Sequence, residues 1–253
     1  MPTPFTHLRV ASRLLADEAL PPDVRALLNA SRGAFLLGNI AADARVSSGI
    51  SREQTHFYAY DRPVQEHPWR LMLQQYPALV RTTRPAQRAF VAGYVAHLTL
   101  DEVWSLEMIR PFFAEREWAS RDHRFLMLNL LLIWMDRRDY AQLEAWQREA
   151  LLATTPDGWA PFIPDEELAA WRDFVGCQLP PGGESQTLAV IGERIGTSPD
   201  ALRALLNSEE RMNADLWAHV PPEALARVEA EMYALARTNM LLYLDNLNGG
   251  TRS

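Results

Sequence analysis

The chain has 253 residues, 48% of them hydrophobic and 23% charged, a composition that suits a soluble globular protein with a large core. Its formal net charge is -7 and it has no lysine- or arginine-rich run, which argues against nucleic acid as a bound scaffold. The single cysteine, Cys177, excludes an intramolecular disulfide. A reducing compartment fits this pattern, and we expect a cytoplasmic protein.

Neither a leader peptide nor a membrane span is predicted. The first residues read MPTPFTH and lack the basic region and apolar stretch of a secretory signal. The most apolar window, residues 125–135, is shorter than the roughly 18 residues that a spanning helix needs. We therefore interpret this window as a core helix.

The first half of the chain reads as successive helices separated by proline and polar segments. We predict helical segments over residues 6–17, 22–28, 33–43 and 66–76. Residues 46–57 are polar and are predicted to form a loop. Pro85 is typical of a first helical position, and it opens a central helix that we expect to run to about Met108 and to end at Pro111.

The second half of the chain is also predicted to form successive helices. Further helices are predicted over residues 122–134, 140–152, 165–175, 188–195 and 223–244. Asp122 is interpreted as a helix N-cap, and Ser198 with Pro199 as an N-cap and first helical residue. The last helix has an apolar stripe formed by Leu225, Val228, Met232, Leu235 and Met240.

No strand alternation, internal repeat or low-complexity tract interrupts this pattern. The predicted fold class is therefore all-α. We expect a single multi-helix domain over residues 1–253, with the chemistry in residues 1–110 and a helical C-terminal half in residues 111–253.

Within the central helix, His97 and Asp101 are four residues apart. Positions i and i+4 lie on the same face of a helix, so both side chains can point at one object. An imidazole and a carboxylate together suit zinc or a similar divalent ion. The alternative is a core histidine that is hydrogen-bonded to a nearby aspartate for structural reasons.

Three more polar residues lie beside apolar sequence that would draw them inward. They are His7 in the first helix, Asp43 at the end of the apolar run, and His56 after the polar segment. Burying an unpaired polar group is costly, so each is expected to find a partner. Their spacing alone does not show that they meet His97 and Asp101.

Four ordered pieces of the first 105 residues resemble the bacterial zinc-dependent phospholipase C family, which is related to the S1/P1-type zinc nucleases. The pieces are THL at 6–8 followed by Ala11, FLLGNIAAD at 35–43, THF at 55–57, and GYVAHLTLD at 93–101. The resemblance implies the all-α fold of that family and a cluster of zinc ions. The remaining residues share no motif with the family beyond their helical pattern.

By this resemblance, Asp43, His56, His97 and Asp101 bind one ion, and Asp101 bridges to a second ion that also takes His7. Such an ion pair activates water and stabilises charge on a phosphoryl group. Asp43 and Asp101 would then be the catalytic carboxylates, with Asp43 orienting the attacking water. The family's third ion requires further histidines soon after the central helix. The next histidine here is His123, so we expect one or two ions.

Other polar residues are weaker candidates. Arg45 and Arg52 flank the predicted ligands and are candidates to clamp a substrate phosphate. His67 and His219 precede prolines or proline-rich turns and are expected to be exposed loop residues, and His123 is a remote candidate ligand. The sequence shows no HExxH, no GxSxG and no phosphate-binding glycine loop.

The predicted function is metal-dependent hydrolysis of phosphodiesters, similar to that of a phospholipase C, on a small-molecule or lipid substrate. Zinc is the expected ion, although these ligands also accept other divalent transition metals. The alternative is a non-catalytic helical binding protein with a structural or vestigial metal site. The sequence specifies neither the substrate nor the oligomeric state.

Overall fold

The computed structural model describes residues 1–58, 66–179 and 183–249, with the backbone alone for residues 246–249. In these ranges all regular elements are helices and there is no strand, which confirms the predicted all-α class. The α-helices are α1 (Pro4–Leu15), α2 (Pro22–Ala30), α3 (Arg32–Ala41), α4 (Arg45–Ser48), α5 (Arg52–His56), α6 (Pro68–Gln75), α7 (Ala78–Arg81), α8 (Pro85–Val103), α9 (Arg121–Tyr140), α10 (Ala145–Leu152), α11 (Asp165–Gly176), α12 (Thr187–Ile195), α13 (Pro199–Asn207), α14 (Glu209–Arg211) and α15 (Pro222–Gly249). A 3-10 turn spans Ala42–Ala44, and π-helical turns span Trp104–Ala114 and Met212–Trp217.

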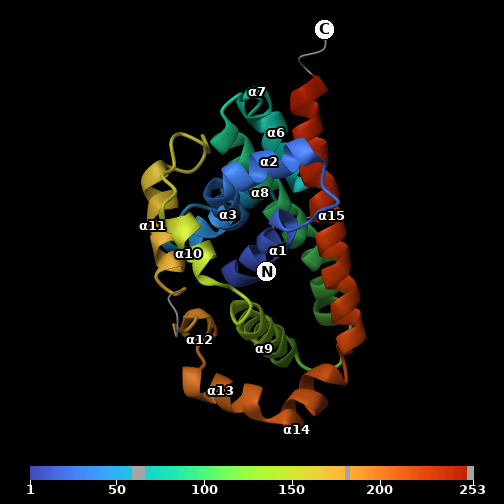
Figure 1. Cartoon of the computed structure of the whole chain (residues 1–253). Coiled ribbons are helices and arrows are strands. Elements are labelled where there is room, and N and C mark those ends of the chain that lie inside the picture. The colour runs from blue at the N-terminus through green and yellow to red at the C-terminus, as the bar shows by residue number, and fades with distance from the viewer. Residues whose placement is uncertain (59–65, 180–182, 250–253) are drawn as a thin grey trace.

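Helix α8 is the centre of the molecule, and its residues from Ala89 to Val103 are all buried. It packs on α3 on one side and on α15 on the other, and α15 runs along one flank of the molecule (Figure 1). The α15 contact includes a buried hydrogen bond of 3.1 Å from Asn239 Nδ2 to Thr99 Oγ1. Because α8 is enclosed in this way, polar side chains on it need partners inside the protein.

Two glycines allow α3 and α8 to approach closely. A Cβ atom at Gly38 would lie 2.0 Å from the Phe90 carbonyl oxygen, and a Cβ atom at Gly93 would lie 2.3 Å from the Phe35 carbonyl oxygen. Any larger residue at either position would push the helices apart. This backbone contact brings the end of α3 beside the middle of α8.

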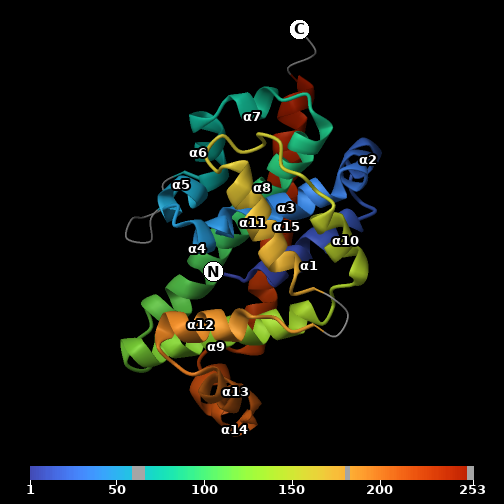
Figure 2. The same ribbon diagram turned by 90° about the vertical axis from the view of Figure 1, so that its left-hand side faces the viewer.

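Some helices of the C-terminal half form a lower group. In Figure 2, α9, α12, α13 and α14 lie below α8, and the N terminus lies between α4 and α12. Helix α1 links the two groups, because it contacts α3 and α8 as well as α9. Among the described residues, no helix combines the length and hydropathy that crossing a bilayer requires.

The predicted loop over residues 46–57 is wrong. The segment contains α4 and α5, two helices of 4 and 5 residues. The Ser51 side chain caps α5 by accepting from the Gln54 backbone N–H at 3.2 Å, and Phe57 ends it in the left-handed region at φ 63°. Such short helices lack the apolar periodicity that a sequence pattern needs, so tertiary contacts decide them.

The expectation that Pro111 ends the central helix is also wrong. Helical backbone continues through it as a π-helical segment, and the Glu115 N–H donates to the Arg110 carbonyl, five residues back, at 2.9 Å. A proline ring clashes with the carbonyl four residues back in a regular α-helix, and the wider π-helical turn relieves that clash.

Three smaller predictions need correction. Ser120, rather than Asp122, caps α9 by accepting from the His123 N–H at 3.2 Å, and Tyr140 ends α9 instead of opening the next helix. Leu235 is 39% exposed, so it lies outside the buried stripe of α15. The Ser198 cap is confirmed, since its hydroxyl accepts from the Ala201 N–H at 3.2 Å.

Candidate metal centre

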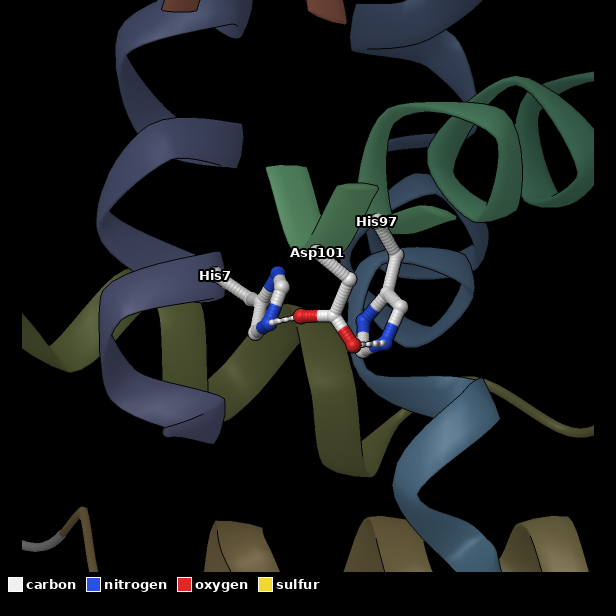
Figure 3. A group of neighbouring side chains, drawn as sticks. All are labelled: His7, His97 and Asp101. Atoms are coloured by element: carbon white, nitrogen blue, oxygen red, sulfur yellow. Dashed lines mark ion pairs between the residues drawn. The ribbon is translucent and has the colours of Figure 1, made fainter. Parts of the chain in front are cut away.

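The five predicted ligands come from four segments of the chain and meet at one buried point. His7 comes from α1, Asp43 from the 3-10 turn after α3, His56 from the last turn of α5, and both His97 and Asp101 from α8. The three histidines and Asp101 are fully buried, and Asp43 is 9% exposed. Figure 3 shows His7 and His97 on opposite sides of the Asp101 carboxylate.

The two oxygens of Asp101 face different histidines. Oδ1 lies 3.5 Å from His7 Nε2, whereas Oδ2 lies 3.2 Å from His56 Nε2 and 3.7 Å from His97 Nε2. His56 Nε2 also lies 3.6 Å from Asp43 Oδ1. The carboxylate of Asp101 therefore stands between two groups of donor atoms, as a bridging ligand would.

These separations are poor for hydrogen bonds but suit ligands that share an ion. Three of the four exceed the 2.7–3.2 Å range that is typical of N–H···O bonds. Zinc ligands lie about 2.0–2.2 Å from the ion, so two atoms on one tetrahedral ion are about 3.3–3.6 Å apart. The distances in the cluster bracket that value.

Several donor atoms of the cluster have no hydrogen-bond partner within the described residues. The Nε2 atoms of His7, His56 and His97 and the Oδ1 atom of Asp101 make no hydrogen bond there. A buried polar atom without a partner costs about 1–3 kcal/mol, and these four face one another. A cation among these atoms would satisfy all of them at once, so the residues present fit a metal ion.

Neighbouring groups hold two of the histidines in the orientation that ligation needs. His97 Nδ1 lies 2.7 Å from the Asn39 carbonyl oxygen, which can only accept, so the proton is on Nδ1 and Nε2 keeps its lone pair. His56 Nδ1 lies 2.8 Å from Thr55 Oγ1. The Tyr94 hydroxyl in turn donates to the Thr55 carbonyl at 2.7 Å and ties α5 to α8.

The electrostatics of the site keep the donor atoms in their metal-binding forms. Burial, and to a smaller extent the adjacent His7, lower the pKa of His97 to about 3, so its imidazole is neutral at neutral pH. Burial opposes ionisation of Asp43, but the adjacent His56 and His97 outweigh it and lower the pKa to about 2. The same balance holds the pKa of Asp101 well below its usual range.

The donor atoms form two overlapping groups of three, each with all members within 4.8 Å of one another. One contains His7, His97 and Asp101, and the other contains Asp43, His56 and His97. The expected division placed His97 with Asp43 and His56 on the first ion. The structure puts His97 within reach of both groups, and its ring stacks on that of His7 with centroids 3.9 Å apart.

The two predicted phosphate-binding arginines lie beside this cluster. Arg52 is nearly buried, with Nη2 3.5 Å from Asp101 Oδ2 and 2.7 Å from the Tyr58 hydroxyl oxygen to which it donates. Arg45 is half-buried and follows Asp43 by two residues. Both line a cavity of about 430 Å³ that reaches the cluster at Asp43.

Much of the lining of this cavity comes from the C-terminal half of the chain. Trp171 and Phe174 of α11 and Val190, Ile191 and Arg194 of α12 line it. The sequence pattern does not mark these residues as part of a site, because they occur in amphipathic helices without a motif. Only the packing of α11 on α4 and on the turn of Asp43, and of α12 on α9, brings them to this cavity.

The other candidate histidines do not join the site. His67 is exposed, as expected, and its Nδ1 lies 2.9 Å from Glu102 Oε1. His219 is half-buried rather than exposed, because its ring stacks on Trp118 with centroids 4.2 Å apart. His123 contacts the edge of the same tryptophan.

Comparison with known families confirms the resemblance. Residues 6–104 match the model of a family described as zinc dependent phospholipase C. This range contains all five residues of the cluster and the two arginines that lie beside it. Comparisons with curated proteins and with solved structures found no match. The second half of the chain, which contributes much of the cavity lining, lies outside the matched range.

Proposed function

We propose that this protein hydrolyses phosphodiesters in the manner of a phospholipase C, with water activated by one or two divalent ions. The family match and the histidine and aspartate cluster support a metal-dependent hydrolase. The observation that carries the proposal is the convergence of three buried, unpartnered Nε2 atoms on carboxylate oxygens at separations of 3.2–3.7 Å.

Five residues would hold the metal. His7 and Asp101 would hold one ion, while Asp43, His56, His97 and Asp101 would hold a second. Zinc is the expected ion, and when bound it supplies a Lewis acid and lowers the pKa of a coordinated water. The Asn39 carbonyl and Thr55 hydroxyl would keep the rings of His97 and His56 fixed, as outer partners of metal ligands commonly do.

Asp43 is the residue best placed to act on the attacking water. It is the member of the cluster that lines the cavity, so substrate and water would reach the site on its side. Its lowered pKa keeps it ionised and able to accept a hydrogen bond from water. Arg52 and Arg45, on the same side of the cavity, would bind the substrate phosphoryl oxygens.

The cavity favours a substrate with both a charged and an apolar part. Its arginines lie near the cluster, and apolar side chains from α4, α11 and α12 form much of its remaining wall. Three of these side chains are also exposed to solvent: Val46 at 53%, Phe174 at 37% and Val190 at 37%. Exposed apolar groups at the edge of a cavity are typical of a ligand-binding site, and a lipid phosphodiester would fit them.

Elemental analysis of the protein, purified without a metal-binding tag or chelator, tests the site directly. We expect about one to two equivalents of a transition metal, lost in His97→Ala and Asp101→Ala. His67→Ala is the matched control, because His67 is an exposed histidine outside the cluster. A metal content of less than about a tenth of an equivalent, unchanged on adding zinc, would refute the proposal.

Activity separates a catalytic ion from a structural one. A metal-loaded protein should hydrolyse bis(p-nitrophenyl) phosphate or phospholipid in vesicles, and His97→Ala should lose that turnover. Full metal loading with no turnover on any phosphodiester, together with a large loss of stability in His97→Ala, would instead indicate a structural site in a binding protein.

A further inference from the structure

The cavity beside the cluster has more positive charge than one phosphodiester requires. Arg45 of α4, Arg52 of α5 and Arg194 of α12 all line it. Two carboxylates line it as well, Asp43 and Glu193. Since Asp43 faces His56 within the cluster, Glu193 is the one acidic side chain among the described lining residues that lies away from it.

The three arginines occupy two different walls. Arg52 and Arg45 lie on the side of the cluster, as described above. Arg194 comes from α12, which lies across the N terminus from α4 in Figure 2 and outside the range that matches the family. An anion held by all three would have to extend from the cluster across the cavity.

Arg194 is held in place by a buried partner. Its Nη2 donates to Asn129 Oδ1 at 2.6 Å, and Asn129 is a core residue of α9 that is 1% exposed. The Asn129 amide nitrogen donates in turn to the Phe125 carbonyl at 2.7 Å, which fixes its orientation. A guanidinium anchored in this way loses less entropy on binding an anion than one on a mobile surface side chain.

The charge of Arg194 reaches the same part of the cavity as the cluster. Burial lowers the pKa of the Met1 α-amino group to about 6, and the charges of Asp101, Arg52, Arg194 and Asp43 all act on that pKa as well. Met1 also lines the cavity. The charge of Arg194 therefore acts on the same lining group as the charges of Asp43, Asp101 and Arg52.

We propose that Arg194 determines substrate specificity by binding a second anionic group, a carboxylate or a phosphate, on a substrate whose phosphodiester lies between Arg45, Arg52 and the cluster. This inference rests on the proposed function for the identity of the reacting group. It predicts that the cavity discriminates against head groups that are cationic at the same position, because a like charge would face Arg194.

Three phosphonates of similar size test this assignment, since the carbon–phosphorus bond is not hydrolysed. They are 3-phosphonopropionate with a second anion, propylphosphonate with none, and 2-aminoethylphosphonate with a cation. Calorimetric titration of the full-length protein should show affinity falling in that order. Arg194→Gln should weaken 3-phosphonopropionate about tenfold, the loss expected for one charge-assisted hydrogen-bonding partner, and leave propylphosphonate within about twofold.

Arg194→Lys should retain part of the preference, because it keeps the charge but not the planar pair of donors. Arg203→Gln, an arginine on α13 that pairs with Asp200 outside this cavity, is the matched control and should change nothing. Equal binding of all three phosphonates, or an equal loss of all three in Arg194→Gln, would overturn the assignment.

The titrations are run both on chelator-treated and on zinc-supplemented protein. A preference for the second anion without metal, in a protein that binds no zinc, would refute the hydrolase and leave the role of Arg194 standing. Zinc binding and turnover without a preference for the second anion would support the hydrolase and refute the role of Arg194.

Discussion

Replacing Gly93 by alanine tests whether the contact between α3 and α8 positions the candidate metal ligands. The added methyl group would lie 2.3 Å from the Phe35 carbonyl oxygen and 3.0 Å from the Asn39 backbone nitrogen. Ordinary contact begins at 3.4 Å, so the two helices would have to separate by about 1 Å. Both obstacles are backbone atoms, which cannot move aside as a flexible side chain can.

The separation would act directly on His97, which lies one turn after Gly93. Its Nδ1 is 2.7 Å from the Asn39 carbonyl on α3, and an increase of about 1 Å would exceed hydrogen-bonding range. Overpacking of this kind costs about 1–3 kcal/mol of unfolding free energy, or about 2–4 °C in Tm per kcal/mol. Loss of the outer partner of a metal ligand typically lowers metal affinity by about 10–100-fold.

Urea denaturation, zinc competition with a chromophoric chelator and nitrogen-15 NMR of the histidine rings would measure these effects. In the metal-free protein, Gly93→Ala should lose the defined Nδ1–H tautomer of His97. Gly176→Ala is the matched control, because its methyl group would meet the Leu152 side chain, 2.5 Å away and free to change rotamer. A Gly93→Ala protein with wild-type stability and zinc affinity would refute the role that we assign to this helix contact.

Three further predictions follow from the same geometry. Thr55→Val would leave the His56 ring without its 2.8 Å partner. It should lower the unfolding free energy by about 1–3 kcal/mol in urea denaturation and weaken zinc binding in the chelator competition. Unchanged values in both assays would contradict the role given to Thr55. His7→Ala should lower the metal content by about one equivalent and leave the other, as read by elemental analysis, and loss of both would show that the two groups are not separate. Burial raises the pKa of Asp136 above 3.8, although the hydroxyls of Ser185 and Thr187 donate to it and oppose the shift. The stability gained from the protonated carboxyl is therefore complete below pH 3.8 and is lost as the pH rises through the raised pKa. Asp136→Asn should therefore gain stability relative to the wild type between pH 4 and pH 7, and a difference in unfolding free energy that does not change with pH would contradict this sign.

The helical fold and the pairing of His97 with Asp101 were predictable because both depend on local geometry. A spacing of four residues places two side chains on one helix face whatever the helix packs against. The same holds for the Ser198 cap, whose hydroxyl bonds a backbone group three residues away. In contrast, α5 was missed because five residues have too little periodicity, and the Ser51 cap and the Tyr94 tether stabilise it.

The sequence alone therefore determined the fold class, the order of the longer helices and, through resemblance to a family, the five residues of the cluster. Only the tertiary structure decided that His7 and His56 meet at Asp101 and that Asp43 reaches His56. These residues come from α1, α5 and the turn after α3, and each reaches α8 only through packing between distant segments. The tertiary structure also decided that Arg194 of α12 lines the same cavity as Asp43 and the two arginines beside the cluster. Such contacts depend on how the faces of helices that are far apart in the sequence pack together. The spacing of residues along the chain does not predict that packing.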